Sequence, residues 1–185
     1  ELGVEPSQVE YAHGEFRTRD SQRTVTLGDL AKAGTFSVKA EGSFSSTFPN
    51  GCHIAEVEVD PDTGVTGIVS YCTVDDCGRV INHTVVEGQM HGGVVQGAGQ
   101  VFGEHVLYDR NTGQLMTGSF SDYYMPRAGL VRGITMEEHP TASKVSPLGI
   151  KGMGESGCTG ALAALTDGVI DALRPLGVQH LDMPL

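Results

Sequence analysis

Five glycines lie inside a segment, from about Thr84 to Phe102, that otherwise has the pattern of an amphipathic helix. The apolar side of this helix recurs at three- and four-residue steps and comprises Val86, Met90, Val94, Ala98, Val101 and Phe102. The glycines are Gly88, Gly92, Gly93, Gly97 and Gly99. Each costs roughly 0.8–1 kcal/mol relative to alanine in a helix interior, and five cost on the order of 4–5 kcal/mol. We therefore expect something to approach the bare backbone closely and offset this cost.

Two kinds of neighbour fit this glycine pattern. Because Gly88 and Gly92 are four residues apart, as are Gly93 and Gly97, each pair exposes backbone on nearby faces of the helix. The neighbour is either another helix or strand, or a ligand whose phosphate is held by exposed amides. Spacing alone leaves both open. The accompanying Gln89, His91, Gln96 and Gln100 suit a heterocycle with mixed donors and acceptors, but they suit a solvated helix face equally well.

Charge and composition exclude several classes of protein. Twelve Lys and Arg against 23 Asp and Glu give a net charge of −11, which disfavours binding to a phosphate backbone, so no nucleic-acid partner is expected. No run approaches the ~20 apolar residues of a membrane span, and no secretory signal is recognisable, so we expect a cytoplasmic protein. Four cysteines without C-x-x-C spacing indicate neither a disulfide framework nor a zinc ribbon. The histidines lack zinc-site spacing.

The remaining pattern predicts an α+β fold. Residues 55–59 and 65–74 alternate around an Asp-Pro-Asp-Thr-Gly turn and predict a β-hairpin with Ala55, Val57 and Val59 facing a core. A second turn of the same kind, at 109–113, predicts a hairpin between 106–108 and 115–116. An apolar stripe predicts a helix from Thr159 to Leu173, ended by Pro175 and Gly177. We expect a mixed or antiparallel sheet from hairpins, packed with two main helices.

The chain is expected to have two parts. Residues 1–50 are polar and broken by glycine, with possible edge strands at 24–27 and 36–38, and are interpreted as a segment that covers the core. Residues 51–185 are expected to form the core domain. Because the sequence begins at Glu1 rather than methionine and ends at Asp182-Met183-Pro184-Leu185, we expect a cut or processed piece of a longer protein.

A second glycine-rich stretch, from Pro147 to Gly157, leads directly into the last helix and contains one acidic residue, Glu155. A carboxylate at this position could cap the helix, where the dipole contributes ~0.3–1 kcal/mol. It could equally serve as a general base on a turn that crowds no substrate, and the two roles are compatible. We interpret the nearby Lys151 as a solvated charge in preference to an anion contact.

Three stretches together carry a family resemblance. The segments 74–82 and 86–100, then 118–126, then the loop 147–157 resemble the large molybdenum subunit of the xanthine dehydrogenase, aldehyde oxidase and carbon monoxide dehydrogenase family, in the family's order. The resemblance extends over most of the chain from about Phe48. One departure is His83, which stands where the family has proline, and we expect it to alter only the entry to a helix.

The resemblance implies specific roles for residues of this chain. Glu155 matches the family's active-site glutamate, the base in a hydroxylation that takes its oxygen from water. Gln96 and its neighbours Gly92, Gly93 and Gly97 match a segment that contacts the molybdenum–pterin cofactor, commonly a cytosine dinucleotide form. Gly152 and Gly154 would lie near the metal. No direct protein ligand to molybdenum is implied, because the pterin supplies the sulfurs.

The same resemblance implies partners that this sequence does not contain. They are the remaining part of the molybdenum subunit, an iron–sulfur subunit, and an FAD subunit or other electron acceptor, with an aldehyde, N-heterocycle or related small molecule as substrate. We expect the isolated chain to be inactive. The alternative is a non-catalytic binding or scaffold domain in which Glu155 only caps a helix. A dinucleotide-binding reductase is disfavoured, because Gly97-Ala98-Gly99 follows no suitable parallel strand.

Overall fold

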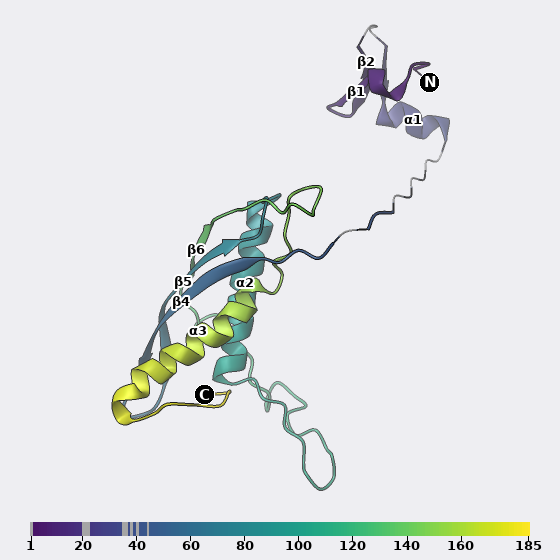
Figure 1. Ribbon diagram of the computed structural model, residues 1–185. Coiled ribbons are helices and arrows are strands. Elements are labelled where there is room, and N and C mark those ends of the chain that lie inside the picture. Colours follow the sequence, from purple (N-terminus) through teal and green to yellow (C-terminus); the bar gives the residue numbers. More distant parts are fainter. Residues whose placement is uncertain (1, 20–22, 35–36, 38, 40, 44) are drawn as a thin grey trace. The chain divides into compact units, whose positions relative to one another are not determined.

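The computed structural model describes residues 2–19, 23–34, 37, 39, 41–43 and 45–185 (Figure 1). The chain divides into two compact units, residues 1–43 and 44–185, and each is described by itself. The division expected from the sequence, 1–50 and 51–185, and the covering role of its first part stay predictions.

The smaller unit is a short antiparallel sheet followed by one short helix. In its described residues the sheet has the order β1-β2-β3, and α1 follows β3 directly. The elements are η1 (Pro6–Gln8), β1 (Val9–Ala12), β2 (Glu15–Thr18), β3 (Thr24–Thr26) and α1 (Leu27–Ala33). The Thr26 hydroxyl accepts a hydrogen bond from the Asp29 N–H at 3.0 Å, so α1 begins at Leu27 and the expected strand stops one residue earlier. Of the other expected edge strand, at 36–38, residues 36 and 38 lie outside the described residues.

The larger unit is built on a mixed sheet. Strands β4 (Asn50–Val59) and β5 (Thr66–Asp76) form the expected antiparallel hairpin, and β6 (Thr135–Glu138) pairs with β5 in parallel. At the hairpin turn the Asp60 carboxylate accepts hydrogen bonds from the N–H groups of Asp62 and Thr63. Ala55, Val57 and Val59 are more buried than Glu56 and Glu58, as the alternation predicted.

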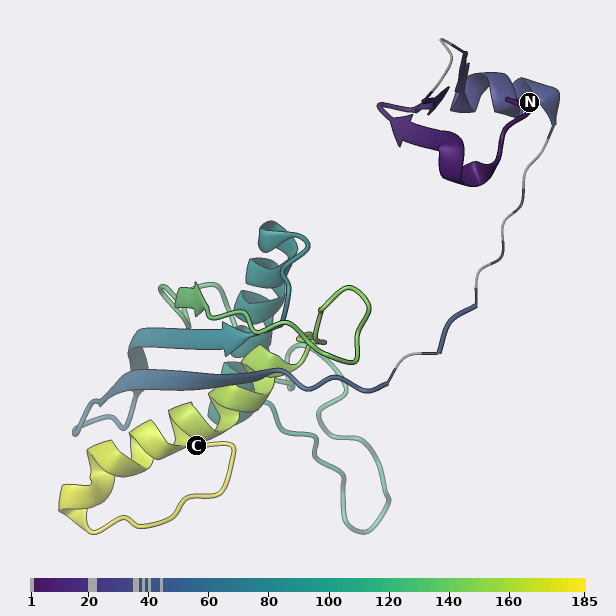
Figure 2. The same ribbon diagram turned by 45° about the horizontal axis from the view of Figure 1, so that its top comes forward.

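Two long helices cover one face of this sheet (Figures 1 and 2). They are α2 (His83–Phe102) and α3 (Ser156–Leu173), the latter followed by η2 (Arg174–Leu176). α3 packs on β4, where Gly168 lies against Val57. Met90 of α2 reaches Thr73 of β5. The fold is therefore α+β, as predicted, and its core contains Ile68, Tyr71, Met90, Val94, Ala98, Val101, Ala161 and Leu165.

The glycines of α2 separate into two groups. A Cβ at Gly93 or Gly97 would lie within 3.0 Å of α3, against Cys158 and Ala161 respectively. At Gly88 and Gly92 a Cβ would meet nothing within 4 Å. Close packing against another helix thus accounts for the first pair, and the second pair is open. The entry of α2 is normal despite His83, since the Asn82 side chain accepts a hydrogen bond from the Val85 N–H.

The second expected hairpin is present only as a loop. Its sole bridge among the described residues joins Tyr108 to Leu115, and neither flank belongs to a strand. The turn itself is formed as predicted, because the Asp109 carboxylate accepts hydrogen bonds from the N–H groups of Asn111 and Thr112. Beyond this bridge the Leu107 N–H donates to the Thr117 hydroxyl instead of a backbone carbonyl, so the ladder does not continue. Among the helices of the described residues, none has the length and apolar character that a bilayer crossing requires.

Candidate functional site

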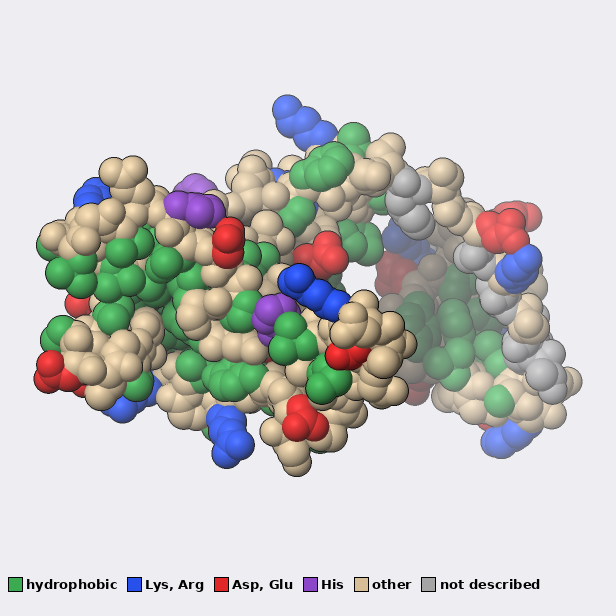
Figure 3. All heavy atoms as spheres, turned by 90° about the horizontal axis from the view of Figure 1, so that it is seen from below, with side chains coloured by type: hydrophobic (Ala, Val, Ile, Leu, Met, Phe, Trp, Pro, Cys, Tyr) green, Lys and Arg blue, Asp and Glu red, His purple; other side chains and the backbone are tan. Residues whose placement is uncertain are grey.

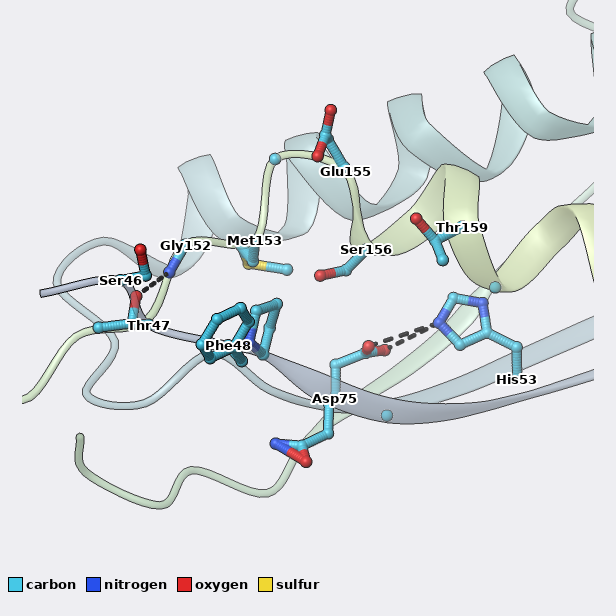
Figure 4. Close-up of a pocket in the computed structure, with 15 residues that line it drawn as sticks. Ser46, Thr47, Phe48, His53, Asp75, Gly152, Met153, Glu155, Ser156 and Thr159 are labelled. Atoms are coloured by element: carbon cyan, nitrogen blue, oxygen red, sulfur yellow. Dashed lines mark hydrogen bonds and ion pairs between the residues drawn. The ribbon is translucent and has the colours of Figure 1, made fainter. Parts of the chain in front are cut away.

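A pocket of about 600 Å³ lies where the glycine-rich loop meets the start of β4 (Figure 4). One wall is the segment 46–51, which enters β4. The opposite wall is the loop 152–155 with the first turn of α3, including Ser156, Thr159 and Gly160. His53 and Asp75, from the helix-covered face of the sheet, also line it. The pocket lies entirely within the larger unit.

The glycine-rich loop is fastened to the end of β5. The Lys151 N–H donates to the Cys77 carbonyl at 2.8 Å, and the Arg79 N–H donates to the Gly149 carbonyl at 2.8 Å. Gly78 has a φ of +69°, and a Cβ there would collide with the Gly149 carbonyl oxygen. Glycine is therefore required at 78 for both its conformation and its close approach. The loop is also joined to the segment 46–51 on the other side of the pocket, because the Gly152 N–H donates a hydrogen bond to the Thr47 hydroxyl at 3.2 Å.

The interpretation of Lys151 as a solvated charge is wrong. Its Nζ lies 2.6 Å from Oδ2 of Asp76, and the two side chains are only 13% and 16% exposed. Burial by itself would raise the pKa of Asp76. Hydrogen bonds from Lys151 and from the N–H groups of Thr141 and Gly78, together with the lysine charge, outweigh that effect and hold this pKa well below its ordinary value.

Glu155 stands at the N-cap position of α3, but its carboxylate does not cap the helix. It makes no hydrogen bond or ion pair with any described residue, and its side chain is exposed. Figure 4 shows it on the rim of the pocket, pointing away from His53 and Asp75. The capping role considered from the sequence is therefore absent, and the carboxylate is free to meet a ligand.

Ser156 supplies an unsatisfied polar atom inside the pocket. Its Oγ is buried and has no hydrogen-bond partner among the described residues. It follows Glu155 at the N-terminus of α3, an 18-residue helix whose first N–H groups have no intrahelical partner. In the same wall, Gly152 has open space where a Cβ would be. A polar group or oxyanion would satisfy this hydroxyl.

A buried polar network forms the pocket floor. The His53 ring lies between Tyr71 and Asp75, with Nδ1 2.7 Å from the Tyr71 hydroxyl and Nε2 3.3 Å from Asp75 Oδ2. Thr73 also donates a hydrogen bond to Asp75. The side chains of His53 and Asp75 are 5% and 3% exposed. Burial, and then the Asp75 charge, raise the pKa of Tyr71 well above its usual value.

Sequence reasoning missed this network. The signal was the alternation of side chains between the two faces of each strand. His53 shares the inward positions of Ala55 and Val57, and Asp75 shares those of Tyr71 and Thr73. A titratable residue at an inward position of a strand needs a partner or a function.

The residues expected to form the site fall into three places. Gly152, Gly154 and Glu155 come together in the pocket. Gly92 and Gln96 lie on the open side of α2, outside the pocket lining. Gly93 and Gly97 are buried against α3, so the faces where their side chains would be are filled by protein. The loop is nonetheless next to α2, because a Cβ at Gly154 would lie 3.4 Å from Nε2 of Gln89. The cofactor-binding roles of these residues stay predictions.

His91 is placed away from this pocket. With His83, Glu87 and Glu138 it lines a separate hollow between α2 and β6. Its Nε2 is buried and has no hydrogen-bond partner among the described residues. His83 pairs with Glu138, with 3.0 Å between Nδ1 and Oε2.

The pocket combines a free carboxylate, an unsatisfied hydroxyl, a helix N-terminus and bare loop backbone. A family model described as the molybdopterin cofactor-binding domain matches residues 1–131 of this chain. The chain belongs to this family. A molybdenum–pterin cofactor fits the residues present, because the Ser156 hydroxyl needs a polar partner and the space at Gly152 is open.

Named relatives agree with the family. The chain is 36% identical over 195 residues to the carbon monoxide dehydrogenase large chain of Hydrogenophaga pseudoflava, which covers 99% of this chain and 24% of the relative. It is 42% identical over 146 residues to the nicotine 6-hydroxylase large subunit of Paenarthrobacter nicotinovorans, covering 79% of this chain and 18% of that subunit.

The fold is shared with solved structures of two oxidoreductases. Quinoline 2-oxidoreductase from Pseudomonas putida 86 matches with a TM-score of 0.78 and 32% identity, over 99% of this chain and 25% of that chain. Carbon monoxide dehydrogenase from Oligotropha carboxidovorans matches with a TM-score of 0.77 and 29% identity, over 99% and 24%. This molybdopterin-binding chain thus spans about a quarter or less of the length of these relatives.

Proposed function

We propose that this chain is one part of a molybdenum hydroxylase and holds one side of its molybdenum–pterin cofactor. The observation that carries the proposal is the Glu155 carboxylate, which makes no capping hydrogen bond and lies at the rim of a pocket of about 600 Å³. The relatives support the class of activity, since their names include a nicotine hydroxylase and a carbon monoxide dehydrogenase. The substrate is an aldehyde, an N-heterocycle or a related small molecule.

The residues of the pocket would have different roles in binding and in proton transfer. The bound cofactor would supply the two-electron oxidation, with water as the source of oxygen. Glu155 would take up the proton released from that water, because an exposed, unpaired carboxylate on a fixed turn can receive one without breaking another contact. The Ser156 hydroxyl would hold a polar or anionic part of the cofactor, and the bare backbone at Gly152 and Gly154 would admit it closely.

The finer points of the proposal follow from the family. The cofactor is a cytosine dinucleotide form of the pterin. The partners are the remaining part of the molybdenum subunit, an iron–sulfur subunit, and an FAD subunit or other acceptor, and the complex is cytoplasmic. The isolated chain would fold but retain no molybdenum and turn over no substrate. Stoichiometric molybdenum in the purified 185-residue chain would contradict this last point.

The decisive experiment is Glu155→Gln in the full complex. The amide keeps the shape of the side chain but cannot accept the proton, so hydroxylation should fall by at least about 10³-fold while molybdenum and pterin contents stay unchanged. The matched control is Asp167→Asn, another acid-to-amide change at an exposed position of α3 outside the pocket, which should leave activity within about twofold.

Two results would contradict the proposal. Activity retained within tenfold in Glu155→Gln, with cofactor bound, would remove Glu155 from the chemistry. A complex that assembles and contains no molybdenum would favour the non-catalytic scaffold instead.

A further inference from the structure

The face of the sheet opposite the two helices carries an uncovered apolar patch. In the register of β4 and β5, Cys52 lies opposite Val74 and Ile54 lies opposite Cys72, and all four side chains point away from α2 and α3. All four residues are exposed, with Ile54 at 66% and Val74 at 44%. We call these four residues the outer patch.

Strand β4 itself shows that this exposure is unusual. Nearer the hairpin turn, its outward residues are Glu56 and Glu58, which are exposed. An antiparallel sheet with one solvated face normally has polar residues on that face. β4 follows this rule at 56 and 58 and departs from it at 52 and 54. A change from polar to apolar within one face of one strand indicates the edge of a covered area. Hydrophobic side chains also reach the surface elsewhere on the larger unit, as the view from below shows (Figure 3).

The borders of the outer patch are acidic. Glu56 is the next outward residue of β4 after Ile54, and Glu137 of β6 lies beside Val74 in the parallel pairing. The whole chain carries a net charge of −11. Two copies of this face would bring like charges together, which disfavours self-association through it. A complementary surface would have aliphatic side chains at its centre and Lys or Arg at its rim.

We propose that the outer patch docks against the remainder of the molybdenum-binding large subunit, through an apolar surface rimmed by Lys and Arg. This inference rests on the proposed function. The Hydrogenophaga relative matches 99% of this chain with only 24% of its own length, so most of such a subunit is available to cover the sheet. The docked surface would bury the Cys52 and Cys72 thiols, which are exposed in the chain alone.

The two thiols provide the test. The sample is a chimera in which this chain replaces the matching part of the Hydrogenophaga carbon monoxide dehydrogenase large chain. It is labelled with N-ethylmaleimide, and the labelling rate of each cysteine is measured by mass spectrometry of its peptide. Each labelling rate is divided by the rate in the urea-unfolded chimera. Docking should slow Cys52 and Cys72 at least about tenfold, as for the buried Cys77. Rates for Cys52 and Cys72 within twofold of the unfolded chain would overturn the proposal.

A variant pair tests the chemistry of the contact. Ile54→Glu places a charge at the centre of the outer patch and should return Cys52 and Cys72 to rapid labelling. Val65→Glu is the matched control, because Val65 is 68% exposed but lies at the hairpin turn, and it should leave the protection unchanged. Equal protection in both variants would overturn the proposal. If the chimera does not fold, the same labelling is done on this chain mixed with the separately produced remainder of that large chain.

Other outcomes remain distinguishable from these. Protection of both thiols in the 185-residue chain alone, with a dimeric mass in analytical ultracentrifugation, would assign the patch to a second copy and overturn the proposal. Molybdenum and pterin contents of the chimera report on the proposed function separately. Protected thiols in a cofactor-free chimera would support the docking surface and contradict the function.

Discussion

Lys151 and Asp76 form an ion pair of 2.6 Å that joins the glycine-rich loop to the end of β5. The same carboxylate accepts hydrogen bonds from the N–H groups of Gly78 and Thr141, so one side chain holds three segments together. The candidate base Glu155 lies four residues beyond this anchor. The position of the pocket rim therefore depends on a contact outside the pocket itself.

Asp76→Asn should destabilise the larger unit. It leaves the Lys151 ammonium largely buried without a counter-charge, and breaking such a pair typically costs about 3–5 kcal/mol. Because these side chains keep some exposure, we expect about 2–3 kcal/mol in urea unfolding. Asp171→Asn is the control, since its pair with Arg174 is over 70% exposed on both sides and contributes at most about 0.5 kcal/mol. Equal effects of the two variants would show that the buried pair is no stronger than a surface one.

Stability should also depend on pH through Asp76. Its pKa is lower in the folded chain than in the unfolded chain, where an aspartate titrates near ~3.9. The contribution is therefore present above about pH 4 and is lost as the pH falls through the folded-state value. We expect the free energy of unfolding to fall more steeply below about pH 4 in the native chain than in Asp76→Asn. Parallel curves for the two proteins would contradict this assignment.

Adjacent glycines of α2 should respond in opposite directions to alanine. Gly93→Ala forces a Cβ into the backbone of Gly157 and Cys158, so the chain should lose about 1–3 kcal/mol of stability. Gly92→Ala meets open space and should gain up to about 1 kcal/mol from helix propensity. Thermal unfolding of the two variants measures both signs. If Gly92 contacts the cofactor, Gly92→Ala should also lower the pterin content of the full complex.

Ser156→Ala tests the unsatisfied hydroxyl. A buried hydroxyl without a partner is unfavourable, so its removal should leave the chain equally stable or more stable by up to about 1 kcal/mol. In the full complex the same change should weaken cofactor retention. Thr166→Val is the control, because Thr166 Oγ1 is also buried without a partner among the described residues but lies outside the pocket lining. Cofactor loss in both variants, or in neither, would contradict a role for Ser156 in binding.

The two long helices, the first hairpin and the loop around Glu155 could be predicted because each follows from local periodicity or turn residues. The apolar stripe of α2 packs as expected from Met90 to Val101. The role of each glycine could not be predicted, because Gly92 and Gly93 differ only in which neighbour reaches them. Neither could the ion pair of Lys151, whose partner Asp76 is 75 residues away in the chain. The strand position of His53 did carry a signal, but its partners Tyr71 and Asp75 depend on the register of β4 and β5.

The loop before α3 is rich in glycine, and such a composition is usually associated with mobility. Here the amides of Lys151 and Gly152 donate to acceptors outside the loop, the Cys77 carbonyl and the Thr47 hydroxyl. Their exchange with deuterated solvent should therefore be governed by opening of the sheet end and of the neighbouring segment, not by motion of the loop alone. The loop that leads to the pocket rim is held to the end of the β-sheet at Lys151, so a ligand would meet a wall already in place before it arrives.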